Sequence, residues 1–145
     1  MRVESSIIIN RPTHEVWSYS SLPKNAPDFA EWVEERKQTT EGPMGIGARG
    51  QDVTKMLGRR FKTTWEVTEW IPEEEVSVKS ISGPLMYKGS CTYASVEGGT
   101  KVTVVFEVDL PGLFKLAEDV VILNAKRQIE MSNHNLKDIL ESRSE

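Results

Sequence analysis

Few side chains in this sequence have the types and spacing that catalysis or metal binding requires. His14 and His134 are the only histidines, and neither has a second histidine one helical turn away, as a metal-binding helix needs. Cys91 is the only cysteine, which excludes an internal disulfide and a multi-cysteine metal site. Its neighbours give no reason for an activated thiolate, and no nucleophile-elbow motif is present. We therefore predict that the protein uses no metal and no cofactor.

Three charged side chains, Asp52, Arg60 and Glu66, have the chemistry to act on the carbonyl group of a bound molecule. Alternation along a strand places Arg60 and Glu66 on the face opposite Trp65, which weakens this role for both. Tyr93 offers a hydroxyl that can reach a ligand, although an ordinary buried tyrosine bonded to the backbone is an equally good interpretation. The sequence therefore supplies no catalytic set.

Three amide side chains, Asn124, Gln128 and Asn135, follow one another near the C-terminus at helical spacing. We expect Asn124 to reach the polar end of a ligand. Gln128 and Asn135 are better explained as the boundary between a buried and a wet helix face.

The element that carries these amides is predicted to be one long helix from Leu110 to Ser142. No glycine follows Gly112 and no proline follows Pro111, so the helix is expected to run uninterrupted for roughly 45 Å. Its predicted apolar stripe consists of Leu113, Leu116, Ala117, Val120, Val121, Ala125, Ile129, Leu136 and Ile139. Its predicted outer face consists of Lys115, Asp119, Lys126, Glu130, Asn133, Lys137 and Glu141. Such a helix needs an apolar surface of its own length, and a broad, curved sheet would supply one.

The rest of the chain alternates between apolar and polar residues in a pattern typical of strands. A first strand ends near Asn10, and two short helices follow, one reaching about Ser21 and one from about Ala26 to Trp32. Six more strands are expected at 33–40, 48–57, 59–71, 75–81, 85–96 and 100–109, separated by turn residues. Short turns imply an antiparallel meander, and the segregation of strands and helices indicates the α+β class. We expect one domain, residues 1–145, with about six or seven strands curved around the long helix.

Composition narrows the classes of function. The 145 residues include 18 Lys and Arg against 22 Asp and Glu, a net charge of -4, which argues against a nucleic-acid-binding protein. No stretch approaches the ~20 apolar residues of a membrane span, and the N-terminal MRVESSIII lacks a cleavage signature. We expect a cytoplasmic protein without stable membrane insertion; the composition predicts no particular oligomeric state.

Several short motifs resemble those of a known superfamily. The segment at 7–17, IIINRPTHEVW, is similar to the opening of polyketide cyclase/dehydrase and lipid-transport proteins, a group that includes lipid-transfer (START-like) domains and birch-pollen-allergen-like proteins. The segments at 24–27, 45–47, 99–103 and 135–137, and Trp32, also resemble that group. The resemblance covers essentially the whole chain and implies a helix-grip fold, in which a curved antiparallel sheet grips a C-terminal helix over an apolar cavity. Its motifs are structural, so no catalytic residue carries over.

The resemblance changes how the apolar inner residues are interpreted. From the residues alone, a filled core is the favoured reading; with the resemblance, a cavity for a lipid, sterol or polyketide-like ligand is favoured. The candidate ligand-binding residues are Trp65, Val67, Tyr93, Val104, Phe106, Leu116, Val120 and Asn124. Two other functions stay open: a cofactor-free cyclase or aromatase, and a protein-interaction module such as a chaperone activator. Polar groups converging in the cavity would favour the enzyme, and a filled interior with an exposed apolar patch would favour the interaction module.

Overall fold

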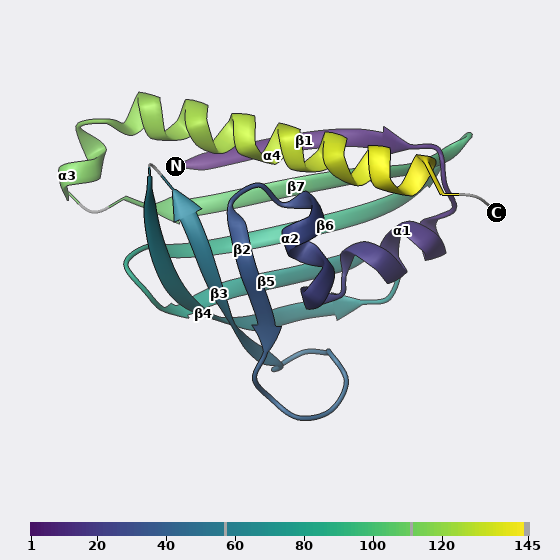
Figure 1. The fold of residues 1–145 in the computed structure, drawn as a ribbon, viewed down its shortest axis with the longest axis horizontal. Helices are drawn as coiled ribbons and strands as arrows, with labels where there is room; N and C mark the ends of the chain where they lie inside the picture. Colours follow the sequence, from purple (N-terminus) through teal and green to yellow (C-terminus); the bar gives the residue numbers. More distant parts are fainter. Residues whose placement is uncertain (57, 111, 144–145) are drawn as a thin grey trace.

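Seven antiparallel strands form one sheet in the order β1-β7-β6-β5-β4-β3-β2 (Figure 1). The computed structural model describes residues 1–56, 58–110 and 112–143. The strands are β1 (Arg2–Ile9), β2 (Val33–Gln38), β3 (Arg49–Met56), β4 (Arg59–Ile71), β5 (Glu75–Ser82), β6 (Met86–Val96) and β7 (Gly99–Asp109). The antiparallel meander and the number of strands are as predicted. Leu57 and Pro111, which belong to predicted elements, lie outside the described residues.

The sheet is bent rather than flat. The pairing of β4 with β5 shifts register between Thr64 and Trp65 and again between Val67 and Glu69, and β2 has a similar irregularity between Val33 and Glu35. An extra residue at such a bulge bends its strand and increases the local twist. Strands β2 to β4 accordingly cross obliquely to β1, β6 and β7 in Figure 1, and the sheet has a concave face.

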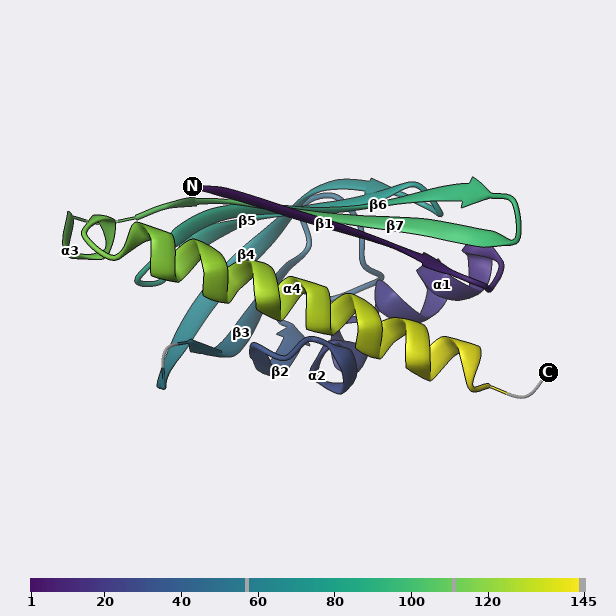
Figure 2. The same ribbon diagram turned by 90° about the horizontal axis from the view of Figure 1, so that it is seen from above.

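The helices lie on one side of this sheet (Figure 2). They are α1 (Thr13–Ser20), a 3-10 turn at Pro23–Asn25, α2 (Ala26–Phe29), α3 (Gly112–Lys115) and α4 (Glu118–Glu141). The main core joins β1, α1, β6, β7 and the C-terminal half of α4 through Ile9, Val16, Trp17, Tyr93, Val102, Leu136 and Leu140. This core fills the end of the fold nearest α1. The concave face further along the sheet is therefore left for other contacts.

The predicted single C-terminal helix is interrupted. α3 ends at Lys115, and α4 begins at Glu118 after a turn in which Ala117 has a non-helical backbone, with φ -113° and ψ 22°. Two acidic residues, Glu118 and Asp119, occupy the first turn of α4, where negative charge favours the positive end of the helix dipole. Glu118 and Asp119 therefore indicate in the sequence where α4 begins. The prediction of one continuous helix relied only on the absence of glycine and proline and did not use these acids.

The rotation of the long helix also differs from the prediction. The side chains of Leu116 and Val120 are 90% and 63% exposed, so the expectation that they face the sheet is wrong. The buried face carries three residues of the predicted stripe, Val121, Ile129 and Leu136, together with Ser132, Asn133 and Leu140. Asn133, predicted on the outer face, is only 4% exposed. Val120 is roughly opposite the centre of that buried face, because each residue turns the helix by about 100°.

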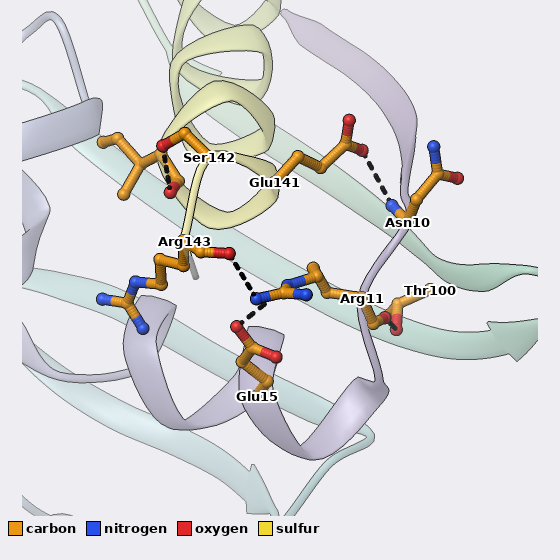
Figure 3. Close-up of polar contacts among 8 residues, drawn as sticks. Asn10, Arg11, Glu15, Thr100, Glu141, Ser142 and Arg143 are labelled. Atoms are coloured by element: carbon orange, nitrogen blue, oxygen red, sulfur yellow. Dashed lines mark hydrogen bonds and ion pairs between the residues drawn. The ribbon is translucent and has the colours of Figure 1, made fainter. Parts of the chain in front are cut away.

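Polar contacts hold the C-terminal end of α4 against β1 and α1 (Figure 3). A carboxylate oxygen of Glu141 accepts hydrogen bonds from the Asn10 backbone N–H at 2.8 Å and from Lys137 Nζ at 2.6 Å. Arg11 donates to the backbone carbonyl of Arg143 at 3.0 Å and to Glu15 at 3.1 Å. The Asn10 bond, followed by Lys137, lowers the pKa of Glu141. This end of α4 is thereby fixed over the main core.

None of the helices within the described residues is long and apolar enough to span a bilayer.

Candidate ligand-binding site

A cavity of ≈ 260 Å³ lies between the concave face of the sheet and the helices α2 and α4. Its walls are predominantly apolar and come from every strand, from α2 and from the middle of α4. Side chains of β4 and β7 alternate as expected, so that Phe61, Trp65, Val104 and Phe106 point inward. A cavity of this size exceeds a 150 Å³ engineered apolar cavity that binds benzene. The interior is therefore hollow enough to hold a small organic molecule.

Four of the eight candidate residues line this cavity, and four do not. Trp65, Tyr93, Val104 and Phe106 contribute to its wall. The remaining four, Val67, Leu116, Val120 and Asn124, do not. Leu116 lies in the exposed turn between α3 and α4, and the rotation of α4 places Val120 in solvent. Asn124 is half-buried beside the cavity-facing side of that helix.

Val67 is buried, at 1% exposed, but it belongs to a separate small core. It packs with Ala48 and Trp65. Its backbone also exchanges hydrogen bonds with the loop before β3, donating to Ala48 and accepting from Gly47. Val67 is therefore packed against the loop before β3 and does not form part of the cavity wall.

The middle of α4 supplies that side of the cavity wall. Ala125, Ile129 and Leu136 belong to the predicted apolar stripe, whereas Gln128, Ser132 and Asn133 were not expected there. Ser132 also accepts a hydrogen bond from the Glu31 backbone N–H at 3.1 Å. Asn135 does not line the cavity, and its amide donates to the Phe29 carbonyl at 3.2 Å. Gln128 therefore faces the cavity, whereas Asn135 ties α4 to the segment around α2.

An ion pair between Arg36 and Asp52 stands at the β2–β3 side of the cavity. Arg36 Nε lies 2.9 Å from Asp52 Oδ1, and Arg36 Nη2 lies 2.9 Å from Asp52 Oδ2. Asp52 Oδ1 also accepts the indole N–H of Trp65 at 2.7 Å. Arg36 and Trp65 line the cavity, while Asp52 is buried behind them. The side chain of Trp65 is thus held in place by the carboxylate that neutralises Arg36.

Gly50 makes room for this arrangement. It pairs directly with Trp65 across β3 and β4, and a Cβ at Gly50 would lie 2.0 Å from the indole ring. Any side chain at this position would have to displace Trp65 or the strand. The glycine lets the indole lie across the backbone with its N–H directed at Asp52.

Sequence reasoning missed Arg36 because the β2 pattern is irregular. Strict alternation from buried Val33 would place Glu35 and Lys37 inward and Arg36 outward. The bulge between Val33 and Glu35 reverses this phase, so that Arg36 pairs with Asp52 on the concave face. No residue type in β2 indicates the bulge. The only sequence signal for an inward Arg36 was the presence of an oppositely charged residue, Asp52, on the next strand.

The hydroxyl of Tyr87 adds a second polar group near the Arg36–Asp52 pair. Tyr87 lines the cavity, and its ring lies 6.0 Å from that of Phe106. Burial and the nearby charge of Asp52 raise the pKa of Tyr87 to about 12. Burial alone would lower the pKa of Arg36, but Asp52 outweighs that effect and raises it. At neutral pH the guanidinium is therefore charged and the phenol is neutral, and both act as hydrogen-bond donors.

A second polar group of side chains lies at the other end, next to the main core. The Tyr93 hydroxyl lies 2.6 Å from Ser20 Oγ, and the Cys91 thiol is close enough to influence the pKa of Tyr93. Burial raises the pKa of the Cys91 thiol to about 11 and that of Tyr93 well above its ordinary value. The Tyr93 hydroxyl is thus already occupied by protein groups. It is less available to a ligand than the sequence suggested.

Residues 1–141 match the protein family described as polyketide cyclase / dehydrase and lipid transport. The chain belongs to this family. The resemblance noted in its sequence motifs is thereby confirmed.

Solved structures similar to this family member support the helix-grip fold. A Thermus thermophilus protein aligns over 100% of both chains with a TM-score of 0.85 and 18% identity. The Zhui aromatase/cyclase of a Streptomyces species has a TM-score of 0.79 and 14% identity, covering 99% of this chain and 94% of that one. A START superfamily protein of Mycobacterium smegmatis has a TM-score of 0.78 and 12% identity, covering 97% of each chain. At these identities, the similarity establishes the fold.

Among the residues that the structure describes, no three or more His, Cys, Asp or Glu side chains are grouped so as to hold a metal ion.

We expect the stability of this polyketide cyclase/dehydrase family member to fall at alkaline pH. The ordinary pKa values are 9.0 for Cys91 and 10.0 for Tyr87, and the folded values are about 11 and about 12. At a pH between the ordinary and the folded pKa of each group, the unfolded chain binds fewer protons than the folded chain. The free energy of unfolding therefore decreases as pH rises through this range. The contribution is complete below pH 9.0 and is lost progressively toward pH 12.

Denaturant midpoints measured across this range would test the expectation. The double variant Cys91→Ala, Tyr87→Phe should lose stability less steeply than the wild type. Equal slopes for the two proteins would show that these groups do not titrate as described.

Proposed function

We propose that this protein binds a small, predominantly apolar molecule in the cavity between the curved sheet and α4. The observation that carries the proposal is the hollow, mostly apolar interior of ≈ 260 Å³ in a chain otherwise folded around a well-packed core. Close packing is the rule for protein interiors, so a void of this size is a specific feature of the fold. In this proposal Trp65, Tyr93, Val104 and Phe106 contact the ligand. A lipid, sterol or polyketide-like compound fits this chemistry, and the whole chain acts as one binding domain in the cytoplasm.

Catalysis is the second candidate function, because Arg36 and Tyr87 present hydrogen-bond donors that can polarise a carbonyl group. A cyclase also needs a group that exchanges protons near neutral pH. Tyr87, Cys91 and Tyr93 all have raised pKa values, and Arg36 is held as a cation. At neutral pH, Tyr87, Cys91 and Tyr93 are therefore neutral and Arg36 is a cation, so none of these four side chains exchanges protons readily. This chemistry favours binding over acid–base catalysis.

A protein-interaction module fits the interior less well. The exposed apolar side chains of Leu116, Val120 and Leu123 on and before α4 resemble part of such a surface. An interaction module of this kind would, however, be expected to have a filled interior. The cavity supports the ligand-binding proposal instead.

Titration with apolar compounds tests the proposal. Trp32 and Trp65 line the cavity, so their emission should change when the cavity is filled. We expect a saturable change in tryptophan emission with at least one of a panel of fatty alcohols, fatty acids, sterols and aromatic polyketides. An emission signal that stays linear with concentration for every compound would contradict a defined binding site.

A further inference from the structure

The polar end of the cavity has an unusual charge arrangement. Arg36 contributes a positive charge to the cavity wall. Two of its nitrogen atoms, Nε and Nη2, each donate to a carboxylate oxygen of Asp52 at 2.9 Å. The pair is therefore neutral as a unit. The carboxylate lies behind the guanidinium, at 1% exposed, whereas Arg36 faces the cavity.

The hydrogen-bonding capacity of this unit is one-sided. Asp52 already accepts bonds from Arg36 and Trp65. Within the part of the chain that the structure describes, Arg36 Nη1 and the Tyr87 hydroxyl make no hydrogen bond to protein. Both belong to residues that line the cavity. The Arg36–Asp52–Tyr87 unit therefore offers two donors to a ligand. Its one remaining acceptor is the phenol oxygen of Tyr87, which serves only a ligand that itself carries an O–H or N–H group.

A carboxylate would meet a penalty at this position. An anion beside Arg36 would also lie near Asp52, and three charges would then share a desolvated site with a net charge of minus one. On the part of the wall that the structure describes, the other cation is the Met1 ammonium, which directly precedes the opposite edge strand β1 and donates to the Val108 carbonyl at 2.8 Å. A neutral carbonyl oxygen accepts the same two hydrogen bonds without adding charge.

We propose that the Arg36–Asp52–Tyr87 unit selects ligands whose polar end is a neutral carbonyl group, such as a ketone, ester or quinone, over carboxylates of the same shape. This inference rests on the proposed binding function and narrows it to a class of ligand. The guanidinium and the Tyr87 hydroxyl bind the carbonyl oxygen, and the apolar walls hold the remainder. Asp52 sets the preference without contacting the ligand.

Three naphthalene derivatives of nearly equal shape test the selection. Methyl naphthyl ketone carries the neutral carbonyl, naphthoate carries the charge, and ethylnaphthalene has neither. Isothermal titration calorimetry at neutral pH should give the ketone an affinity at least about tenfold above naphthoate and several-fold above ethylnaphthalene.

Two variants assign the preference to named groups. Tyr87→Phe should lower the affinity for the ketone several-fold and leave ethylnaphthalene unchanged. Asp52→Asn keeps the shape and an acceptor for Trp65, but it leaves Arg36 uncompensated. This variant should bind naphthoate at least about tenfold more tightly than the wild type does. If Asp52→Asn does not fold, Tyr87→Phe with the three compounds still decides the matter.

The outcomes separate the two proposals. Failure of all three compounds and of the whole panel of fatty alcohols, fatty acids, sterols and aromatic polyketides to bind would contradict the binding function itself. Failure of the three compounds while a member of that panel binds would overturn the selection only. Equal binding of all three would leave an apolar binding site and overturn the selection. Tightest binding of naphthoate by the wild type would also overturn the selection.

Discussion

Asp52→Ala is expected to lower the free energy of unfolding by about 3 kcal/mol, the low end for breaking a buried ion pair. The substitution removes the partner of Arg36 and the acceptor of the Trp65 indole N–H. The guanidinium would be left near the cavity with an uncompensated charge. The low end of the range applies because Arg36 keeps contact with the cavity, where water can reach it. Denaturant unfolding followed by far-UV circular dichroism measures the effect.

The outer face of the same sheet offers a matched control. Arg49 on β3 and Glu66 on β4 form an ion pair at 2.8 Å, as Arg36 on β2 and Asp52 on β3 do at 2.9 Å. The Arg49 side chain, however, is 55% exposed. Glu66→Ala should therefore cost at most about 1 kcal/mol. Combining Asp52→Ala with Arg36→Met should cost less than the sum of the two single variants, because the unpaired charge is then absent. Additive losses would contradict a coupled buried pair.

Val104→Trp is expected to abolish ligand binding while leaving the protein folded. Val104 lies in the middle of β7 and points into the cavity. An indole ring at this position can occupy space that is otherwise empty, so the overpacking cost of about 1–3 kcal/mol should be largely avoided. Probe affinity should fall at least about tenfold because the volume is taken. Titration and denaturant unfolding of the same sample give both quantities.

Val120→Trp is the control for this experiment. Val120 is 63% exposed on α4, so the larger side chain should extend into solvent and change neither stability nor binding. A Val104→Trp variant that is strongly destabilised would indicate that the interior is packed at this point. Unchanged probe binding in that variant would place the binding site elsewhere.

The strands were predictable because one face of each is buried. In β4 the inward residues Phe61 and Trp65 alternate with Lys62 and Glu66, so a period of two fixes both the strand and its orientation. The alternation in β7 placed Val104 and Phe106 on the cavity wall for the same reason. Residues that obey a simple period along an uninterrupted strand could thus be assigned from the sequence.

The rest of the site depends on features that carry no periodic signal. The bulge in β2 moves Arg36 to the concave face, and no periodic residue pattern marks it. Leu116 before α4 and Val120 and Leu123 on it are apolar but exposed, whereas the buried face of α4 includes the polar Ser132 and Asn133. The hydrophobic pattern identified Val121, Ile129 and Leu136 correctly, but it could not separate them from the exposed apolar residues or find Ser132 and Asn133 on the buried face.

Methyl NMR tests the ligand-binding proposal most directly, because methyl groups inside and outside the cavity appear in one spectrum. Val76, Val104 and Ile129 line the cavity, whereas Val120 and Leu123 face solvent. On addition of methyl naphthyl ketone, we expect saturable shifts of the methyl signals of the three cavity residues and constant positions for those of the two outer residues. Shifts confined to Val120 and Leu123, or no saturable shift at all, would contradict binding inside the cavity.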